Sequence, residues 1–291
     1  MELFEAAMLI SDGIATALSQ KKGFLVGRNG TIELEALITY KQKNFLFQQQ
    51  GLILEKHAGV FPSNEFSHRH WVQDTEAAIK NTDLLVAGWF APLVREEKVY
   101  LASLGRNSVA LPLRSLEPYY VPMEMMWTRY LKYHKVAVVS SFAQTAMKQI
   151  PKAKEIWGDR AGSLLPTDTQ FIPIPTGYAP VLANGRAEWP GKPATWEAAV
   201  DSVVKQVVDS GAEIVLIGCG GLGMIIGYRL KLLGKVCIVM GGAIQVLFGI
   251  KGNRWETHAT ISRFWNDAWV YPSLDETPAN SSSVEKGCYW K

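Results

Sequence analysis

A glycine-rich turn at residues 218–223 has the spacing Gly-x-Gly-x-x-Gly and directly follows the apolar run 213–217. A helical pattern over 224–233 and a second apolar run over 235–240 come next. Strand, glycine turn, helix and strand in this order form a unit whose backbone N–H groups and helix N-terminus can hold a diphosphate. We therefore predict that a phosphate or nucleotide is contacted by the backbone of Gly218, Gly220 and Gly221.

The same spacing occurs in nicotinamide and flavin sites, which also place a carboxylate at the end of the second strand to hold the ribose hydroxyls. Here the second strand ends in Val239-Met240-Gly241-Gly242, without a carboxylate or an arginine. An NAD(P)-dependent oxidoreductase is therefore the weaker interpretation. Gly241 and Gly242 open a further turn, which we expect to contact the same phosphorylated ligand.

A second strand–turn–helix junction lies near the N-terminus, where residues 24–26 run into a turn at 27–30 and Thr31 opens a helix. Ligands of α/β proteins bind at such strand ends. We therefore expect Arg28, Asn29, Gly30 and Thr31 to contact the phosphorylated ligand. Arg28 can grip a diphosphate with two N–H groups, and Glu33 can hold a divalent metal ion or a sugar hydroxyl. The alternative is a solvated arginine and a glutamate that stabilises the helix N-terminus.

A third group of candidates follows the second glycine turn within one loop: Lys251, Arg254 and Trp255. Two cations and an aromatic ring suit a phosphate and a stacked base or sugar. A solvated basic loop with a core tryptophan would show the same residues. Trp89, directly after the apolar run 84–87, could similarly line a sugar site or belong to the core.

Several acidic and histidine side chains are of the types that act as a general base. The candidates are Glu33, Asp74 and His70, followed by His68 and Asp168. His68 and His70 are two positions apart, so on a helix they do not share a face and do not form a joint metal site. Each of these side chains could also be solvated or bonded locally, and the sequence does not decide among them.

The elements that must position these residues alternate between strands and helices. Apolar runs predict strands near 24–26, 84–87, 135–139 and 170–174, in addition to the two around the glycine turn. Helical spacing predicts helices over 2–20, 123–133 and 195–210, and one that Asn64 or Ser67 caps and that ends near Asn81. This order predicts an α/β fold with a Rossmann-like, mostly parallel sheet and helices on both faces.

Composition excludes several classes of protein. The 291 residues are 48% hydrophobic, which indicates a globular chain. A net charge of +3, from 30 basic and 27 acidic residues, is too small for a nucleic-acid surface. The three cysteines form no CxxC pair, no apolar run reaches the length of a membrane span, and the N-terminus lacks a cationic leader. We expect a cytoplasmic protein; its oligomeric state is open.

Several segments resemble a known family. Residues 28–33, Arg-Asn-Gly-Thr-Ile-Glu, look like the Arg-x-Gly-Asp-x-Glu segment of glycosyltransferases of the GT-D type. The remaining segments look like a subgroup of polysaccharide glycosyltransferases, and they comprise residues 135–145, 217–223, 241–255, 266–273 and 284–290. The most specific is 241–255, Gly-Gly-Ala-Ile-Gln-Val-Leu-Phe-Gly-Ile-Lys-Gly-Asn-Arg-Trp, followed by the C-terminal Gly-Cys-Tyr-Trp.

The resemblance implies a single glycosyltransferase domain over 1–291, with an N-terminal half (1–134), a nucleotide-binding half (135–255) and a wrapping tail (256–291). It implies transfer of a hexose or deoxyhexose, such as rhamnose, from a nucleoside-diphosphate sugar such as a UDP-sugar to a glycan acceptor. In the family the Asp-x-Glu pair serves Mn²⁺ or Mg²⁺ and the donor. Thr31 replaces that aspartate here, so Glu33 alone is left for a metal.

Two alternatives to a glycosyltransferase stay open. One is the nicotinamide enzyme built on residues 218–223. The other is a protein that binds a nucleotide sugar without catalysis, which the missing carboxylate at Thr31 would explain. The sugar, the nucleotide, the acceptor and the stereochemistry are not decided by the residues.

Overall fold

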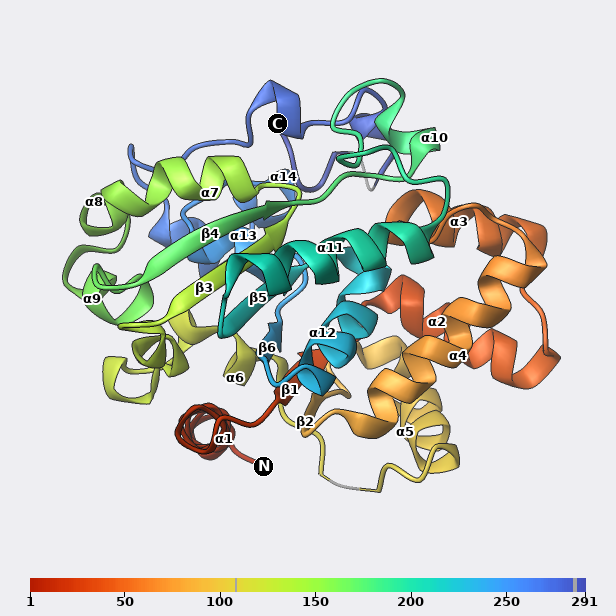
Figure 1. Ribbon diagram of the computed structural model, residues 1–291, viewed down its shortest axis with the longest axis horizontal. Helices are drawn as coiled ribbons and strands as arrows, with labels where there is room; N and C mark the ends of the chain where they lie inside the picture. The colour runs from red at the N-terminus through yellow and green to blue at the C-terminus, as the bar shows by residue number, and fades with distance from the viewer. Residues whose placement is uncertain (108, 285–286) are drawn as a thin grey trace.

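In the computed structural model, which describes residues 1–107, 109–284 and 287–291, one six-stranded sheet forms the centre of the molecule (Figure 1). Every pairing is parallel, and the strand order is β2-β1-β6-β5-β3-β4. This confirms the α/β class. The strands are β1 (Phe24–Arg28), β2 (Leu84–Val86), β3 (Lys135–Ser140), β4 (Gln170–Pro175), β5 (Ile214–Gly218) and β6 (Val236–Val239).

The central strands read as continuous apolar runs because helices cover the sheet on both faces. In β5, Ile214 and Leu216 belong to the core on one face, while Val215 and Ile217 belong to the core on the other, and all four are fully buried. β6 alternates in the same way, since Ile238 lies in the first core and Val239 in the second.

One face carries the helices that pack with the second core. They are α2 (Thr31–Lys43), α3 (Gln48–Ala58), α4 (Glu65–Asn81), α5 (Val94–Ser103), α11 (Trp196–Ser210) and α12 (Gly223–Leu232). The opposite face carries α1 (Leu3–Gln20), α6 (Leu113–Leu116), α7 (Ala143–Gln149), α8 (Ala153–Trp157), α9 (Ala161–Leu164) and α13 (Ala243–Leu247). Figure 1 shows α11 and α12 in front of the strands and α1 below their left half.

The helix boundaries follow local signals in the sequence. Asn64 caps α4, its side-chain oxygen accepting from the backbone N–H of Ser67 at 2.9 Å, as predicted. Thr195 caps α11 by the same kind of bond to Ala198, and Gly211 ends that helix in a left-handed conformation with φ +70°. Among the helices of ten or more residues, α3 and α5 were not expected from the sequence; in α3, Leu52 and Ile53 point outward and obscure the helical spacing.

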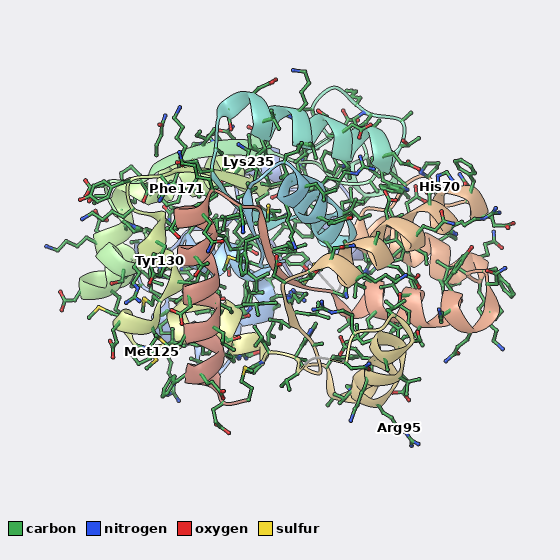
Figure 2. The ribbon with its side chains drawn as sticks, turned by 60° about the horizontal axis from the view of Figure 1, so that its bottom comes forward. His70, Arg95, Met125, Tyr130, Phe171 and Lys235 are labelled. Carbon is green, nitrogen blue, oxygen red and sulfur yellow. The ribbon has the colours of Figure 1, made fainter. Side chains whose placement is uncertain are left out.

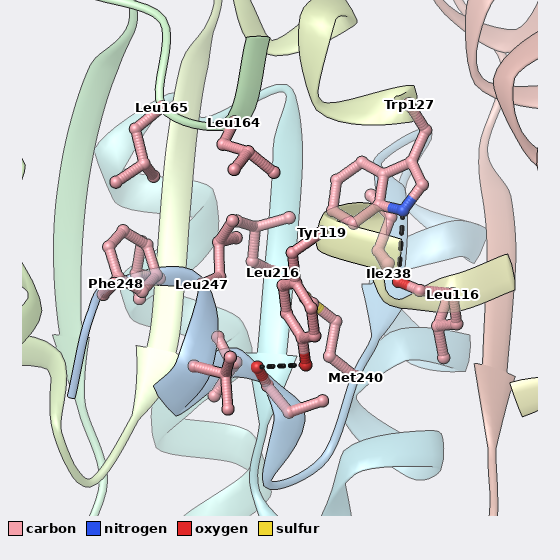
Figure 3. Packing of buried hydrophobic residues seen from close by; sticks show 14 of the residues in the cluster. Leu116, Tyr119, Trp127, Leu164, Leu165, Leu216, Ile238, Met240, Leu247 and Phe248 are labelled. Atoms are coloured by element: carbon pink, nitrogen blue, oxygen red, sulfur yellow. Dashed lines mark hydrogen bonds between the residues drawn. The ribbon is translucent and has the colours of Figure 1, made fainter. Parts of the chain in front are cut away.

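The helix predicted over 123–133 is wrong. The segment forms two short 3₁₀ turns, Met123–Met125 and Trp127–Leu131. Three consecutive residues of this segment, Met126, Trp127 and Thr128, are fully buried. The Trp127 indole N–H also donates to the carbonyl of Leu116 at 3.1 Å, which fixes the turn against α6 (Figure 3).

The segment after Trp255 is pinned to the body at several points. The carboxylate of Glu276 accepts the backbone N–H groups of Gln144 and Thr145 at the start of α7, at 2.9 and 3.1 Å. The indole of Trp290, 1% exposed, donates to the Glu276 carbonyl. Residues 285–286 of the C-terminal family segment lie outside the described residues. Two short helices complete the fold, α10 (Pro180–Ala183) and α14 (Asn253–Glu256).

Candidate functional site

The loops that follow β1 and β6 leave the sheet toward opposite faces. After β1 the chain enters α2, on the face of α12; after β6 it enters α13, on the face of α1. β1 and β6 are neighbours and parallel. In open α/β sheets, ligands bind outside the carboxyl ends of strands where the connections diverge in this way. The candidate site is therefore the sheet edge between residues 28–30 and 240–242.

Arg28, at the end of β1, bridges the two loops. A Cβ atom placed on Gly241 would lie 2.7 Å from Arg28 Nη2, and the φ of +61° at Gly241 is a backbone conformation that favours glycine. The guanidinium stacks on Trp89, 4.9 Å from the ring centroid. Its Nη1 donates to the Asn29 carbonyl at 3.3 Å, while its buried Nε–H has no partner among the described residues.

A second arginine reaches the neighbouring residue of the same turn. A Cβ on Gly242 would lie 3.3 Å from Arg254 Nη1 and 2.8 Å from Tyr289 Cε1. The Arg254 guanidinium lies over the Tyr289 ring at 4.2 Å, and the side-chain amide of Gln245 donates to the Tyr289 carbonyl at 2.8 Å. Two guanidinium groups, each stacked on an aromatic ring, thus converge on Gly241-Gly242.

The loop after β2 fixes the ring beneath Arg28. Gly88, with φ +70°, precedes Trp89, and its backbone N–H donates to the Glu97 carboxylate at 2.7 Å. Glu97 is 3% exposed, and burial raises its pKa, which the bond to Gly88 partly offsets. Glu97 on α5 therefore positions Trp89, and through Trp89 it positions Arg28. Sequence analysis gave Glu97 no role.

A buried carboxylate that the sequence did not single out lies beside Arg28. Glu117 is 6% exposed and pairs with Arg114, whose Nη1 donates to Glu117 Oε2 at 2.7 Å. Burial raises the pKa of Glu117, while Arg114 and then Arg28 oppose the rise. The following Tyr119 packs against Met240 at the end of β6, and its hydroxyl donates to the Ala243 carbonyl (Figure 3). The only signal in the sequence is an arginine three residues before a glutamate.

Glu33 turns back toward Gly30, so that a Cβ atom at Gly30 would collide with its carboxylate. It is 8% exposed and lies in the first turn of α2, where the helix dipole stabilises a negative charge. Among the described residues, no three His, Cys, Asp or Glu side chains form a group that could hold a metal ion. Thr31 and Glu33 do not make a metal ligand set by themselves, and the arrangement fits the helix-terminus interpretation of Glu33.

The glycines at the start of α12 lie under the end of α3. Gly220 has φ +45°, and a Cβ there would lie 2.8 Å from the carbonyl oxygen of Ala58; at Gly221 the distance would be 3.1 Å. The Gly221 carbonyl accepts the indole N–H of Trp71 at 2.8 Å. Close packing on α3 accounts for both glycines. A Cβ on Gly218 would collide with Ile244 and approach the Gly241 carbonyl at 2.9 Å. A donor contact from the three stays a prediction.

Lys251 and Trp255 are placed differently from Arg254. The Lys251 ammonium lies 5.3 Å from the ring centroid of Trp265 and 6.0 Å from that of Tyr271. Trp255 is 8% exposed and belongs to the core on the α1 face. Trp255 therefore has little surface to offer a ligand, as expected for a core tryptophan.

The other general-base candidates lie in contacts of their own. Asp74 on α4 pairs with Arg229 of α12 at 3.1 Å, and that arginine also pairs with Asp201 of α11 at 2.6 Å. The His70 ring lies against that of Phe66 at a tilt of 55° and faces Glu197 at 3.7 Å, at the margin of the molecule (Figure 2). These contacts tie helices to one another, and none of them includes Arg28 or the 241–242 turn.

Two further candidates are also accounted for. His68 is 6% exposed, lies 3.2 Å from the Ser63 hydroxyl, and burial lowers its pKa. Asp168 pairs with Lys132 at 3.3 Å. It lines an open hollow of about 420 Å³, together with His134 and Glu213, at the amino-terminal edge of the sheet and therefore opposite the candidate site.

The chain is thus an α/β protein with a candidate site at the carboxyl ends of β1 and β6, where two arginines are stacked on aromatic rings. No family model matches the chain, and no curated protein matches it. Two solved structures are similar. One is a highly conserved domain of unknown function 1792, reported to have a distinct glycosyltransferase fold; it shares 10% identity, with 82% of each chain covered and a TM-score of 0.38. The other, a selenomethionine-substituted structure of domain 1792, shares 11% identity over 83% of each chain, with a TM-score of 0.37.

Proposed function

We propose that the protein is a glycosyltransferase whose nucleoside-diphosphate sugar binds at the edge between β1 and β6. The observation that carries the proposal is the convergence of Arg28 and Arg254 on the Gly241-Gly242 turn. Guanidinium groups hold phosphate oxygens in pairs of N–H bonds, and both guanidinium groups lie against this turn because Gly241 and Gly242 have no side chains. Transfer of a sugar, beyond the binding of a diphosphate, is supported by the sequence resemblance to glycosyltransferases.

In the proposed reaction the acceptor hydroxyl oxygen forms a bond to the anomeric carbon, and the bond from that carbon to the diphosphate oxygen breaks. The diphosphate leaves with the electron pair, so negative charge develops where Arg28 and Arg254 lie. The hydroxyl proton passes to a carboxylate. The candidates are two buried carboxylates, Glu33, which lies against Gly30, and Glu117, which pairs with Arg114 at 2.7 Å.

We propose that the reaction needs no metal ion, because no described His, Cys, Asp or Glu side chains complete a ligand set with Glu33. The two arginines supply the cationic charge that a divalent ion would otherwise bring. A UDP-sugar, transfer of a hexose or of a deoxyhexose such as rhamnose, and a glycan acceptor in polysaccharide synthesis remain part of the proposal. They rest on the resemblance alone.

The first test is a thermal-shift screen with UDP, GDP, dTDP, CDP and NADH, each with Mn²⁺ and with EDTA. A ligand that binds only the folded state raises the melting temperature by mass action. We expect a shift with one nucleoside diphosphate that persists in EDTA. A shift with NADH alone would move the function to redox chemistry, and a shift that requires Mn²⁺ would restore the metal.

The second test separates a site from general charge. Arg28→Ala removes two charge-assisted hydrogen bonds, each worth about 1.5–3 kcal/mol, so the Kd of the nucleoside diphosphate should rise at least about a hundredfold. Arg28→Lys keeps the charge and should lie in between. Arg229→Ala is the control, since Arg229 pairs with Asp74 and Asp201 between helices. Binding by folded Arg28→Ala within threefold of the wild type would refute the site.

A further inference from the structure

Four large apolar side chains between residues 45 and 53 are exposed, where α2 ends and α3 begins. They are Phe45, Phe47, Leu52 and Ile53, with exposed fractions of 45%, 52%, 52% and 38%, and we call them the corner surface. The rings of Phe45 and Phe47 touch edge to face with centroids 5.2 Å apart. In Figure 1 this corner lies at the margin of the molecule, on the side away from α7 to α9.

The corner surface is not a badly packed part of the core. α3 already buries one side, through Gly51, Leu54 and Ala58, against the glycine turn before α12 and against α2. Leu52 and Ile53 lie on the other side of the same helix, where no described element covers them. Contiguous exposed apolar groups of this kind mark interaction surfaces.

Unpaired positive charge flanks the corner surface. Lys41 and Lys43 end α2, and Lys56 lies one turn after Leu52 on α3. None of the three lysines forms an ion pair with any residue that the structure describes. The segment 41–56 contains these three lysines and one carboxylate, Glu55, so its net charge is positive. Aromatic and aliphatic side chains surrounded by lysines are the composition that favours an anionic lipid surface.

A second exposed apolar group, on α1, has the opposite charge. Phe4 is 49% exposed and Met8 37%, but their neighbours are Glu2 and Glu5. An anionic surface would repel this group. The combination of apolar side chains with unpaired lysines therefore distinguishes the corner surface from α1, and hydrophobic exposure alone does not.

We propose that the corner surface docks the protein onto an anionic membrane. The two phenylalanines, Leu52 and Ile53 enter the boundary between headgroups and acyl chains, and the lysines contact the anionic headgroups. Among the described residues no helix is long and apolar enough to cross a membrane, so the contact is peripheral. α2 has 13 residues, so its start beside Arg28 lies about 20 Å from the corner. This inference does not depend on the proposed transferase activity.

The test is flotation of the full chain with lipid vesicles, of phosphatidylcholine alone or with 30% phosphatidylglycerol. We expect binding to the anionic vesicles that falls as salt rises. Replacing Lys41, Lys43 and Lys56 by Gln should lower partitioning on the order of a hundredfold, at roughly a fivefold factor for each lysine. The double variant Phe47→Ser, Leu52→Ser should lower it at least about tenfold.

The matched control is the double variant Phe4→Ser, Met8→Ser, which removes comparable exposed apolar groups from α1 and should bind as the wild type does. Thermal melts check that each variant is folded. The proposal is overturned if the wild type does not float with anionic vesicles, or if it binds neutral vesicles equally well. It is also overturned if Phe47→Ser, Leu52→Ser converts a dimer into a monomer in sedimentation without changing flotation, because the surface would then join two copies of the chain.

Discussion

Glu276 should be the strongest single attachment of the C-terminal segment, and Glu276→Ala tests this. The carboxylate is 7% exposed and accepts four hydrogen bonds: from the backbone N–H groups of Gln144 and Thr145, and from the hydroxyls of Thr145 and Ser273. It also places negative charge at the N-terminus of α7, which the helix dipole favours. Nothing else described caps that helix start with a side chain.

The expected loss of stability follows from the donors left behind. Alanine would leave two backbone N–H groups and the Thr145 hydroxyl without their acceptor, and each buried unsatisfied group costs about 1–3 kcal/mol. Ser273 is partly exposed and can turn to water. We therefore expect the free energy of unfolding to fall by about 3–5 kcal/mol. Glu276→Gln keeps the shape and one acceptor oxygen, so it should cost about 1–2 kcal/mol.

The assay is urea unfolding followed by tryptophan fluorescence, with limited proteolysis of the C-terminal segment in the absence of urea. The control is Asp275→Ala, because Asp275 lies next to Glu276 in the same turn and is exposed. It should change the free energy of unfolding by less than about 0.5 kcal/mol. A loss below about 1 kcal/mol for Glu276→Ala would refute the reasoning, since buried donors would then have found other partners.

Three further predictions concern a glycine that packs under α3, the support of Trp89, and a buried histidine of α4. Gly220→Ala should lower the free energy of unfolding by about 1–3 kcal/mol without any ligand, because φ is +45° and the Cβ would lie 2.8 Å from a backbone carbonyl of α3. The control in the same urea titration is Gly185→Ala, at φ +86° in open space, which measures the cost of the backbone conformation alone. Glu97→Gln should loosen the loop that carries Trp89, weakening binding of the nucleoside diphosphate while costing about 1–2 kcal/mol of stability. Burial lowers the pKa of His68, so the unfolded chain binds a proton more readily than the folded one. The free energy of unfolding should therefore fall as pH drops below about 6.5, by up to roughly 1.4 kcal/mol per pH unit. For His68→Asn the free energy of unfolding should change less steeply with pH between about 6.5 and 5.

Local patterns in the sequence predicted most of the strands and the longer helices. β3, β5 and β6 were recognisable because strands buried on both faces are continuous apolar runs. In place of the helix expected over 123–133 the chain forms two 3₁₀ turns, and the tertiary hydrogen bond that fixes them, from the Trp127 indole to the Leu116 carbonyl, leaves no mark in the local pattern. α3 was missed because its outward side carries Leu52 and Ile53.

The candidate site was only partly predictable, because local sequence patterns do not determine the order of strands in the sheet. Arg28 and Gly241-Gly242 were each expected at a strand end, but only the adjacency of β1 and β6 shows that the arginine reaches the glycines. Glu117 and Glu97 were missed because their burial depends on helices distant in sequence. Asp74 and His70 were general-base candidates because of their residue types, and their partners, Arg229 and Glu197, lie more than 120 positions along the chain.

The place of β6 in the sheet has a consequence for how the chain folds. β6 is the last of the six strands in the sequence, yet it lies between β1 and β5 and is what joins the β2-β1 pair to the β5-β3-β4 group. Until residues 236–239 are in place, both groups present an open strand edge, and such edges pair readily with other chains. The pairing of β1 with β6 joins residues about two hundred positions apart, and contacts so distant in sequence form slowly. Aggregation during refolding should therefore compete mainly with the insertion of one four-residue strand, and variants that delay this insertion should lose yield before they lose stability.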